Sequence, residues 1–290
     1  MTLYTFGNLH KLRAESFADK LAELAVRALL SEVCVTPKPG LVDCENSGAH
    51  KDMDIFMFIE SAVSLYPYYR SVAMRSLEYE GSADKLLAII QPIGVQAEGE
   101  MFAVTKGVNT HKGAIFSLSV LCAAVCVLAK QKAEATALNL SKACSSIAKA
   151  RSRSAAELIT DTNGGLAYKK HGISGILGEA SAGFSSVFDI ALPAMREHAF
   201  KAVSLQDAAV AALLHLIAEV DDTNIVARGG IEALHDIQTK VSMQISAFNE
   251  ISEYICFAKE LDEEFIRKNI SPGGCADLLA VALMVHYILP

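Results

Sequence analysis

Apolar residues recur at helical spacing along most of this chain, and no run alternates apolar and polar residues for more than a few positions. The clearest case is an early segment with Glu23 and Arg27 on one side and five apolar residues on the other: Leu21, Leu24, Ala25, Ala28 and Leu29. Because exposed strands need a period of two, this pattern predicts an all-α fold. No linker rich in Pro, Gly or Ser and no shift in composition divides residues 1–290, so we expect a single compact multi-helix domain.

The sequence also predicts where helices begin and end. Pro67 interrupts a helical pattern over 53–79, so that helix should end or kink near Leu65. The glycine-rich residues 161–178 predict a long loop, and the helix after it should stop at Pro193. Other helices are expected at 16–34, 82–102, 113–129, 131–160, 179–192, 205–220 and 231–268, with a last helix introduced by residues 271–274.

The composition excludes several classes of function. A formal net charge of −7 argues against nonspecific nucleic-acid binding, because neutralising phosphates requires a basic surface. Seven cysteines, an odd number with no metal-site spacing, indicate reduced thiols in a cytoplasmic protein. The apolar run 113–129 is short for a membrane span and carries serines, so it predicts a buried central helix and no membrane partner. The first residues show no secretory signal pattern.

A polar stretch lies between two apolar helical segments and reads EVCVTPKPGLVDCENSGAHKDMD over residues 32–54. Its two prolines predict an extended, non-helical arm that can hold Lys38 at a fixed place. Asp43, Asn46 and His50 are spaced three and four apart and would share one face if residues 42–50 were helical. The alternative is a solvated loop with ordinary turn residues.

A second polar segment, TKGVNTHKGA at 105–114, leads directly into the most apolar helix. It places Asn109, His111 and Lys112 at the N-terminus of that helix, where free N–H groups and the helix dipole favour an anion. This is the geometry of a phosphate site. The alternative is simple helix capping by Asn109 or Thr110.

Two more polar segments begin helices near the end of the chain. The first, DDTNIVARGG at 221–230, offers oxygen ligands for a hard cation from Asp221, Asp222 and Asn224. It also offers a phosphate clamp from Arg228, Gly229 and Gly230. SPGGCAD at 271–277 introduces the last helix with Gly273 and Gly274 and carries Asp277 in its first turn. No Walker-A and no dinucleotide-binding motif is present, so this inventory favours Mg²⁺ on a polyphosphate held without either motif.

Taken together, the motifs TPKPGLVDxxNxGAHKDMD, EMF followed by GVNTHKGAIFSL, GEAxxGF, DTNxxxRGG and NxSPGGxADLL resemble the triphosphoribosyl-dephospho-coenzyme A synthase family. The resemblance is specific and extends in order over nearly the whole chain. It implies that the ribose 2′-hydroxyl of 3′-dephospho-coenzyme A attacks the anomeric carbon of ATP and that adenine leaves. The product would be the precursor of the prosthetic group of citrate lyase or of malonate decarboxylase.

The resemblance implies roles that the residue types allow. Glu98 or Glu100 would be the general base, and His50 or His111 would assist the departure of adenine. The triphosphate would lie against Lys38, Asn109, Lys112, Asn224, Arg228, Gly229, Gly230, Gly273 and Gly274. Mg²⁺ would be bound among Asp52, Asp54, Asp221 and Asp222, and further site residues are Asp43, Asn46, Glu179 and Asp277. For each residue the alternative role is a helix cap or an ion pair.

The chain departs from the family pattern at two places. Ile176 and Leu177 stand where the family tends to have Ala-Arg, so no arginine contact is expected from that segment, and Cys275 replaces the usual serine after SPGG. Two rival functions stay open: a Mg²⁺-dependent hydrolase of nucleotides or N-glycosides, and a non-catalytic partner of the acyl carrier subunit. A homodimer and a contact with a downstream acyl carrier protein transferase also stay open.

Overall fold

The computed structural model describes residues 13–154, 163–200 and 203–289, and all regular secondary structure in these ranges is helical. The all-α expectation is therefore confirmed. The elements, in chain order, are α2 (Ala14–Cys34), α3 (Ile55–Ser64), α4 (Tyr66–Glu78), α5 (Ala83–Val104), α6 (Lys112–Gln131), α7 (Ala137–Ser154), α8 (Asn163–His171), α9 (Gly175–Ser181), the π-helix η1 (Val187–Ala191), α10 (Leu192–Phe200), α11 (Leu205–Glu219), α12 (Thr223–Ile245), α13 (Ile251–Lys268) and α14 (Gly273–Ile288).

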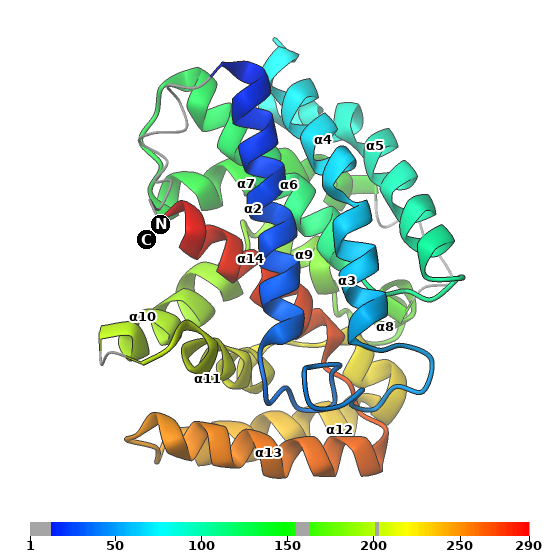
Figure 1. Ribbon diagram of the computed structural model, residues 1–290, viewed down its shortest axis with the longest axis vertical. Coiled ribbons are helices and arrows are strands. Elements are labelled where there is room, and N and C mark those ends of the chain that lie inside the picture. The colour runs from blue at the N-terminus through cyan, green and yellow to red at the C-terminus, as the bar shows by residue number, and fades with distance from the viewer. Residues whose placement is uncertain (1–12, 155–162, 201–202, 290) are drawn as a thin grey trace.

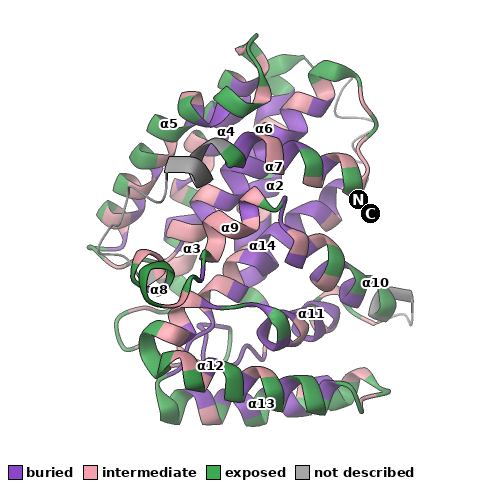
Figure 2. Cartoon of the chain, turned by 180° about the vertical axis from the view of Figure 1, so that it is seen from behind, coloured by how far each residue is buried: buried purple, intermediate pink, exposed green. Residues whose placement is uncertain are grey.

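Two very apolar helices, α6 and α14, form the centre of the molecule. α14 packs against α2, α6 and α11, and α6 packs against α4, α5 and α7 (Figure 1). The buried surface is concentrated on these inner helices, and the outer faces of α5 and α13 are exposed (Figure 2). Within the described ranges, α6 is the one helix long and apolar enough to cross a membrane, and its burial at the centre accounts for that composition.

The helix break predicted before Pro67 is confirmed. α3 ends at Ser64, Leu65 makes a turn, and α4 begins at Tyr66 with the proline in its first turn. Proline is accepted there because the first turn of a helix does not use its N–H groups for internal hydrogen bonds.

The prediction of a long loop over 161–178 is wrong, because α8 and α9 occupy most of it. α8 packs against α12 and α9 packs against α7, so tertiary contacts outweigh the low helix propensity of the glycines. Residues 161 and 162 lie outside the described residues, as do residues 155–160 at the end of the helix predicted for 131–160.

The expected helix 179–192 and its stop at Pro193 are also wrong. α9 ends at Ser181, and the chain turns at Gly183 before η1 runs directly into α10. Pro193 is the second residue of α10 and directly follows the π-helix η1, so the proline does not end the helical run. The single segment expected at 231–268 is divided into the end of α12 and α13 by a turn at 246–250.

The loop between α2 and α3 lies beneath the C-terminal end of α2, against α12 and α13 (Figure 1). It is not helical at 42–50, so that conditional expectation is wrong. The carboxylate of Asp43 accepts hydrogen bonds from the backbone N–H groups of Lys38 (3.0 Å), Glu45 (2.7 Å) and Asn46 (3.0 Å). Asp262 of α13 accepts from the Gly40 N–H at 2.8 Å and from the Asn46 side chain at 2.9 Å. These two carboxylates give the loop a defined shape without helical bonds.

Gly40 should be essential to this loop. Its φ is +68°, and a Cβ built there would lie 2.2 Å from the carbonyl oxygen of Ile270. We expect Gly40→Ala to lower the free energy of unfolding by about 2–4 kcal/mol, from left-handed backbone strain plus overpacking. Urea denaturation measures this change in the free energy of unfolding. The matched control is Gly94→Ala in α5, where a Cβ meets no atom within 4 Å, and which should leave stability unchanged or slightly raised. Equal stability of the two variants would contradict this account of the loop.

Candidate active site

Polar residues from separate parts of the chain meet where α14 begins. Asp222, which is 1% exposed, accepts hydrogen bonds through Oδ1 from the N–H groups of Asn224 (2.7 Å) and Ile225 (3.2 Å). Its Oδ2 accepts from the Cys275 N–H at 2.8 Å. One carboxylate therefore caps α12 and also connects it to the first turn of α14. Burial raises the pKa of Asp222, and these hydrogen bonds partly oppose the rise.

The start of α6 lies against the same turn of α14. A Cβ on Gly113 would be 1.9 Å from Oδ2 of Asp277, so only glycine allows this approach. The pKa of Asp277 is raised by burial and by the nearby carboxylates of Glu32 and Asp222, whereas a hydrogen bond from the Ala114 N–H lowers it. A carboxyl with a raised pKa among other acidic groups is a frequent feature of catalytic sites.

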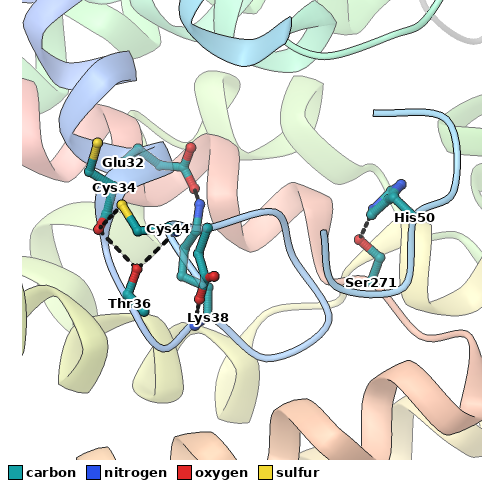
Figure 3. Close-up of polar contacts among 8 residues, drawn as sticks. Glu32, Cys34, Thr36, Lys38, Cys44, His50 and Ser271 are labelled. Atoms are coloured by element: carbon teal, nitrogen blue, oxygen red, sulfur yellow. Dashed lines mark hydrogen bonds and ion pairs between the residues drawn. The ribbon is translucent and has the colours of Figure 1, made fainter. Parts of the chain in front are cut away.

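Lys38 is held as predicted, but not as a free cation. Its Nζ lies 2.5 Å from Oε1 of Glu32 at the end of α2, and both side chains are buried (Figure 3). Burial raises the pKa of Glu32, and Lys38 partly opposes this. The sequence analysis did not select Glu32. Its signal was a charged residue on the apolar face of an amphipathic helix, three residues after the buried Leu29.

His111 precedes α6 and is 2% exposed. Its Nδ1 lies 2.8 Å from the Ser61 hydroxyl, its ring meets the edge of Phe58 at 5.0 Å between centroids, and Nε2 has no hydrogen-bond partner. Burial, with a smaller contribution from Lys38, lowers its pKa to about 3. The imidazole is therefore neutral at pH 7.

His50 lies on the loop between α2 and α3. Its Nε2 is 2.9 Å from the hydroxyl of Ser271 (Figure 3). Its Nδ1 is 3.2 Å from a guanidinium nitrogen of Arg228. Arg228 also donates to the Ala49 carbonyl at 3.0 Å and to the Asn269 side chain at 3.0 Å. Ser271 is a second residue to which the sequence analysis gave no role, although it begins the SPGG motif.

Glu98 and Glu100 differ in their surroundings. Glu98 forms an ion pair with Lys112 at 3.2 Å, next to the Gly113 contact with Asp277. Glu100 instead accepts a long hydrogen bond, 3.4 Å, from the Tyr68 hydroxyl. Asn109 is exposed, and its side-chain oxygen accepts from the Lys112 N–H at 3.1 Å, so it caps α6 as the alternative role supposed.

The remaining candidates divide into three groups. Glu179 lies near Cys275 and accepts from the Ser186 hydroxyl at 2.7 Å, while Gly273 and Gly274 pack beside Asn224 and Asp222. Gly229 and Gly230 are exposed where α12 kinks, with φ of +84° at Gly230. Asp43 and Asn46 belong to the bracing of the loop described above.

The four carboxylates predicted to bind metal do not come together. Among the described residues, no group of three or more His, Cys, Asp or Glu side chains is placed to hold a metal ion. Asp54 caps α3 by accepting from the Met57 N–H at 2.9 Å, and Asp222 caps α12. Asp52 is exposed, and Asp221 accepts from Gln238 at 3.3 Å. Two of the four predicted ligands, Asp54 and Asp222, already accept hydrogen bonds from helix N–H groups, and a Mg²⁺ site that also uses substrate phosphates stays a prediction.

Concavity alone does not mark this site. One surface depression of about 500 Å³ is lined by α2 and α4 residues, namely Glu23, Val26, Arg27, Leu30, Ser31, Cys34 and Tyr66. Another of about 430 Å³ is lined by Asp84, Ser141, Lys142, Ser145, Ser146, Lys149 and Ala182. Neither contains the groups around Asp277 or Asp222, so the meeting of polar side chains is the stronger criterion for the site.

Comparisons with known proteins identify the family of this chain. The family model for CitG, ATP:dephospho-CoA triphosphoribosyl transferase, matches residues 18–289. A Vibrio cholerae protein named "Probable 2-(5''-triphosphoribosyl)-3'-dephosphocoenzyme-A synthase" is 36% identical over 286 residues, covering 96% of this chain and 90% of the relative. A relative from Salmonella choleraesuis with the same name, numbered 1, is 38% identical over 278 residues, covering 93% and 91%.

A crystal structure described as a triphosphoribosyl-dephospho-CoA synthase from Archaeoglobus fulgidus is similar over 78% of this chain and 95% of its own, with 20% identity and a TM-score of 0.47. At that TM-score the likeness adds nothing to the assignment. The family match and the curated relatives show that this chain belongs to the ATP:dephospho-CoA triphosphoribosyl transferase family.

The neutral state of His111 makes stability depend on pH. Its pKa is about 3 in the folded chain and 6.5 ordinarily, so between these values the unfolded chain binds a proton that the folded chain does not. The free energy of unfolding should therefore fall as the pH falls from about 6.5, by up to roughly 1.4 kcal/mol per pH unit from this one group. Urea denaturation of the wild type and His111→Gln between about pH 7 and pH 5 isolates the effect. Parallel pH dependences would contradict it.

Proposed function

We propose that this chain transfers the 5-triphosphoribosyl group of ATP to the ribose 2′-hydroxyl of 3′-dephospho-coenzyme A and releases adenine. The observation that carries the proposal is the meeting of the family's motifs in one place: α6, α12 and α14 all begin around Asp222 and Asp277. Lys112 and Arg228 lie on two of these helices. The product would be the prosthetic-group precursor of citrate lyase or of malonate decarboxylase.

The chemistry requires a base for the incoming hydroxyl, help for the leaving adenine and negative charge near an oxocarbenium-like sugar. We assign the base to Glu98 in preference to Glu100, because Glu98 pairs with Lys112 beside the start of α6. Asp222, whose carboxylate accepts three backbone N–H hydrogen bonds, supplies negative charge. His111 is neutral at pH 7, so it is not an imidazolium ion that could protonate adenine. Its role would be to donate a hydrogen bond to adenine from Nε2, which has no hydrogen-bond partner among the described residues.

For the triphosphate, Lys112 and Arg228 are the candidate cationic contacts, with Asn224 and the backbone of Gly273 beside them. Lys38 already forms an ion pair with Glu32, so its proposed effect on the triphosphate is electrostatic and involves no direct contact. Mg²⁺ would arrive as the partner of ATP and be held largely by phosphate oxygens, since Mg²⁺ commonly uses only one or two protein carboxylates. No step of the reaction is assigned to it.

The cellular setting is proposed on separate grounds. All seven cysteines are free, which supports a cytoplasmic location. The homodimer and a contact with a downstream acyl carrier protein transferase stay predictions, and light scattering and co-purification would test them.

The reaction itself is tested by incubating the protein with ATP, Mg²⁺ and 3′-dephospho-coenzyme A, beside a control without the acceptor. We expect free adenine only when the acceptor is present, together with an adduct of the mass of a triphosphoribosyl product. Adenine in both samples would indicate a hydrolase. Absence of adenine together with absence of ATP binding by calorimetry would favour a non-catalytic partner of the acyl carrier subunit.

The choice of base is tested by two matched variants on the same helix. Glu98→Gln should lower kcat about 100-fold or more, in line with the usual contribution of general base catalysis, and leave ATP binding within a few-fold. Glu100→Gln should retain most activity. If Glu100→Gln loses the activity and Glu98→Gln keeps it, the two roles are reversed.

A further inference from the structure

Ser271 has a buried hydroxyl placed just before the first turn of α14. The residue is 2% exposed, and its Oγ lies 2.9 Å from Nε2 of His50. It follows Asn269 and Ile270, whose backbone borders Arg228 and Gly40. A serine beside a histidine can suggest an activated nucleophile. The contact between His50 and Arg228 excludes a nucleophilic role for Ser271.

The tautomer of His50 follows from hydrogen-bond chemistry. A guanidinium has only donors, so the 3.2 Å contact from Arg228 requires Nδ1 of His50 to accept. A neutral imidazole carries one proton, which must then be on Nε2. Nε2–H therefore donates to Ser271 Oγ and has no lone pair with which to remove the serine proton. His50 cannot activate Ser271 as a nucleophile in this arrangement.

The charged groups around His50 support the neutral form. Arg228 faces the ring from α12, and Asp52 faces it from the same loop with Oδ1 3.9 Å from Nδ1, beyond hydrogen-bond distance. The carboxylate of Asp52 is 64% exposed, so solvent screens it.

Because Ser271 Oγ accepts a hydrogen bond from His50, its own hydroxyl proton is available to donate to another acceptor. Its Oγ accepts from His50, and no acceptor for its O–H is found among the residues that the structure describes. Arg228 contacts the backbone carbonyl of Asn269, two residues before Ser271, at 3.4 Å, and the glycines that begin α14 follow Ser271 in the chain. A phosphate oxygen is the acceptor that suits a hydroxyl donor next to a guanidinium.

We propose that Ser271 donates a hydrogen bond to a phosphate oxygen of bound ATP, and that His50 is a positioning residue that, as the Nε2–H tautomer accepting from Arg228, turns the Ser271 proton toward it. This inference rests on the proposed function, since ATP is the ligand. It replaces a proton-transfer role for His50 with an orienting one.

The tautomer is tested first, without any ligand. Two-dimensional ¹H–¹⁵N spectra of the histidine side chains in the full chain, with His50→Gln to assign the signals, should show His50 with a protonated Nε2 and an unprotonated Nδ1 at neutral pH. A protonated Nδ1 would overturn the inference, whatever the enzyme does.

Binding of ATP and of inorganic triphosphate is then measured by calorimetry. Ser271→Ala should weaken both by about ten- to a hundredfold, as expected for a lost hydrogen bond to a charged group. The matched control is Ser76→Ala, which removes an equally buried hydroxyl on α4 that donates to the Val72 carbonyl, and it should bind as the wild type does. Unchanged binding by Ser271→Ala overturns the inference but not the proposed function, whereas no binding by the wild type overturns both.

Two His50 variants separate orienting from proton transfer. The glutamine amide in His50→Gln can still donate to Ser271 and should keep kcat within a few-fold with a modest rise in the KM for ATP. His50→Leu should raise that KM about tenfold or more. If both variants lose kcat equally and the pH profile of kcat loses a limb, His50 transfers protons and the proposal is wrong.

Discussion

The carboxylate of Asp222 is the interaction on which the site depends. It serves backbone N–H groups at the starts of α12 and α14, and the farthest of these donors, Cys275, is 53 positions along the chain from Asp222. A buried carboxylate is stable only when such donors surround it, and those donors exist only where helices begin. The cost of burying this charge is therefore offset by the same geometry that places Asn224, Gly273 and Asp277 beside one another.

The other buried charges obey the same rule. Glu32 and Lys38 neutralise each other at the end of α2, and Asp277 takes a hydrogen bond from the start of α6. Breaking such a pair by removing one partner leaves an uncompensated charge, which typically costs several kcal/mol. Together these contacts hold several buried carboxyl groups close to one another. Negative charge is concentrated where a developing positive charge on a sugar would be stabilised.

Local sequence predicted most helices because their determinants are local. The apolar period of α2, the break before Pro67 and the buried character of α6 all follow from residues within one or two turns. The errors came where packing outweighs propensity. The glycines of α8 and α9 are helical because neighbouring helices cover them, and Pro193 continues a helical run because η1 leads directly into α10. Neither fact is visible in the segment itself.

The sequence by itself determined the all-helical class, the polar segments and the family motifs, because spacing and residue type are sufficient for these. Only the tertiary structure decided which side chains face one another. It paired Lys38 with Glu32, used Asp54 and Asp222 as caps where a metal set was expected, and brought Ser271 to His50 across more than two hundred residues. The physical reason is that a polar side chain serves whichever partner the packing of distant helices presents, and sequence spacing does not record that partner.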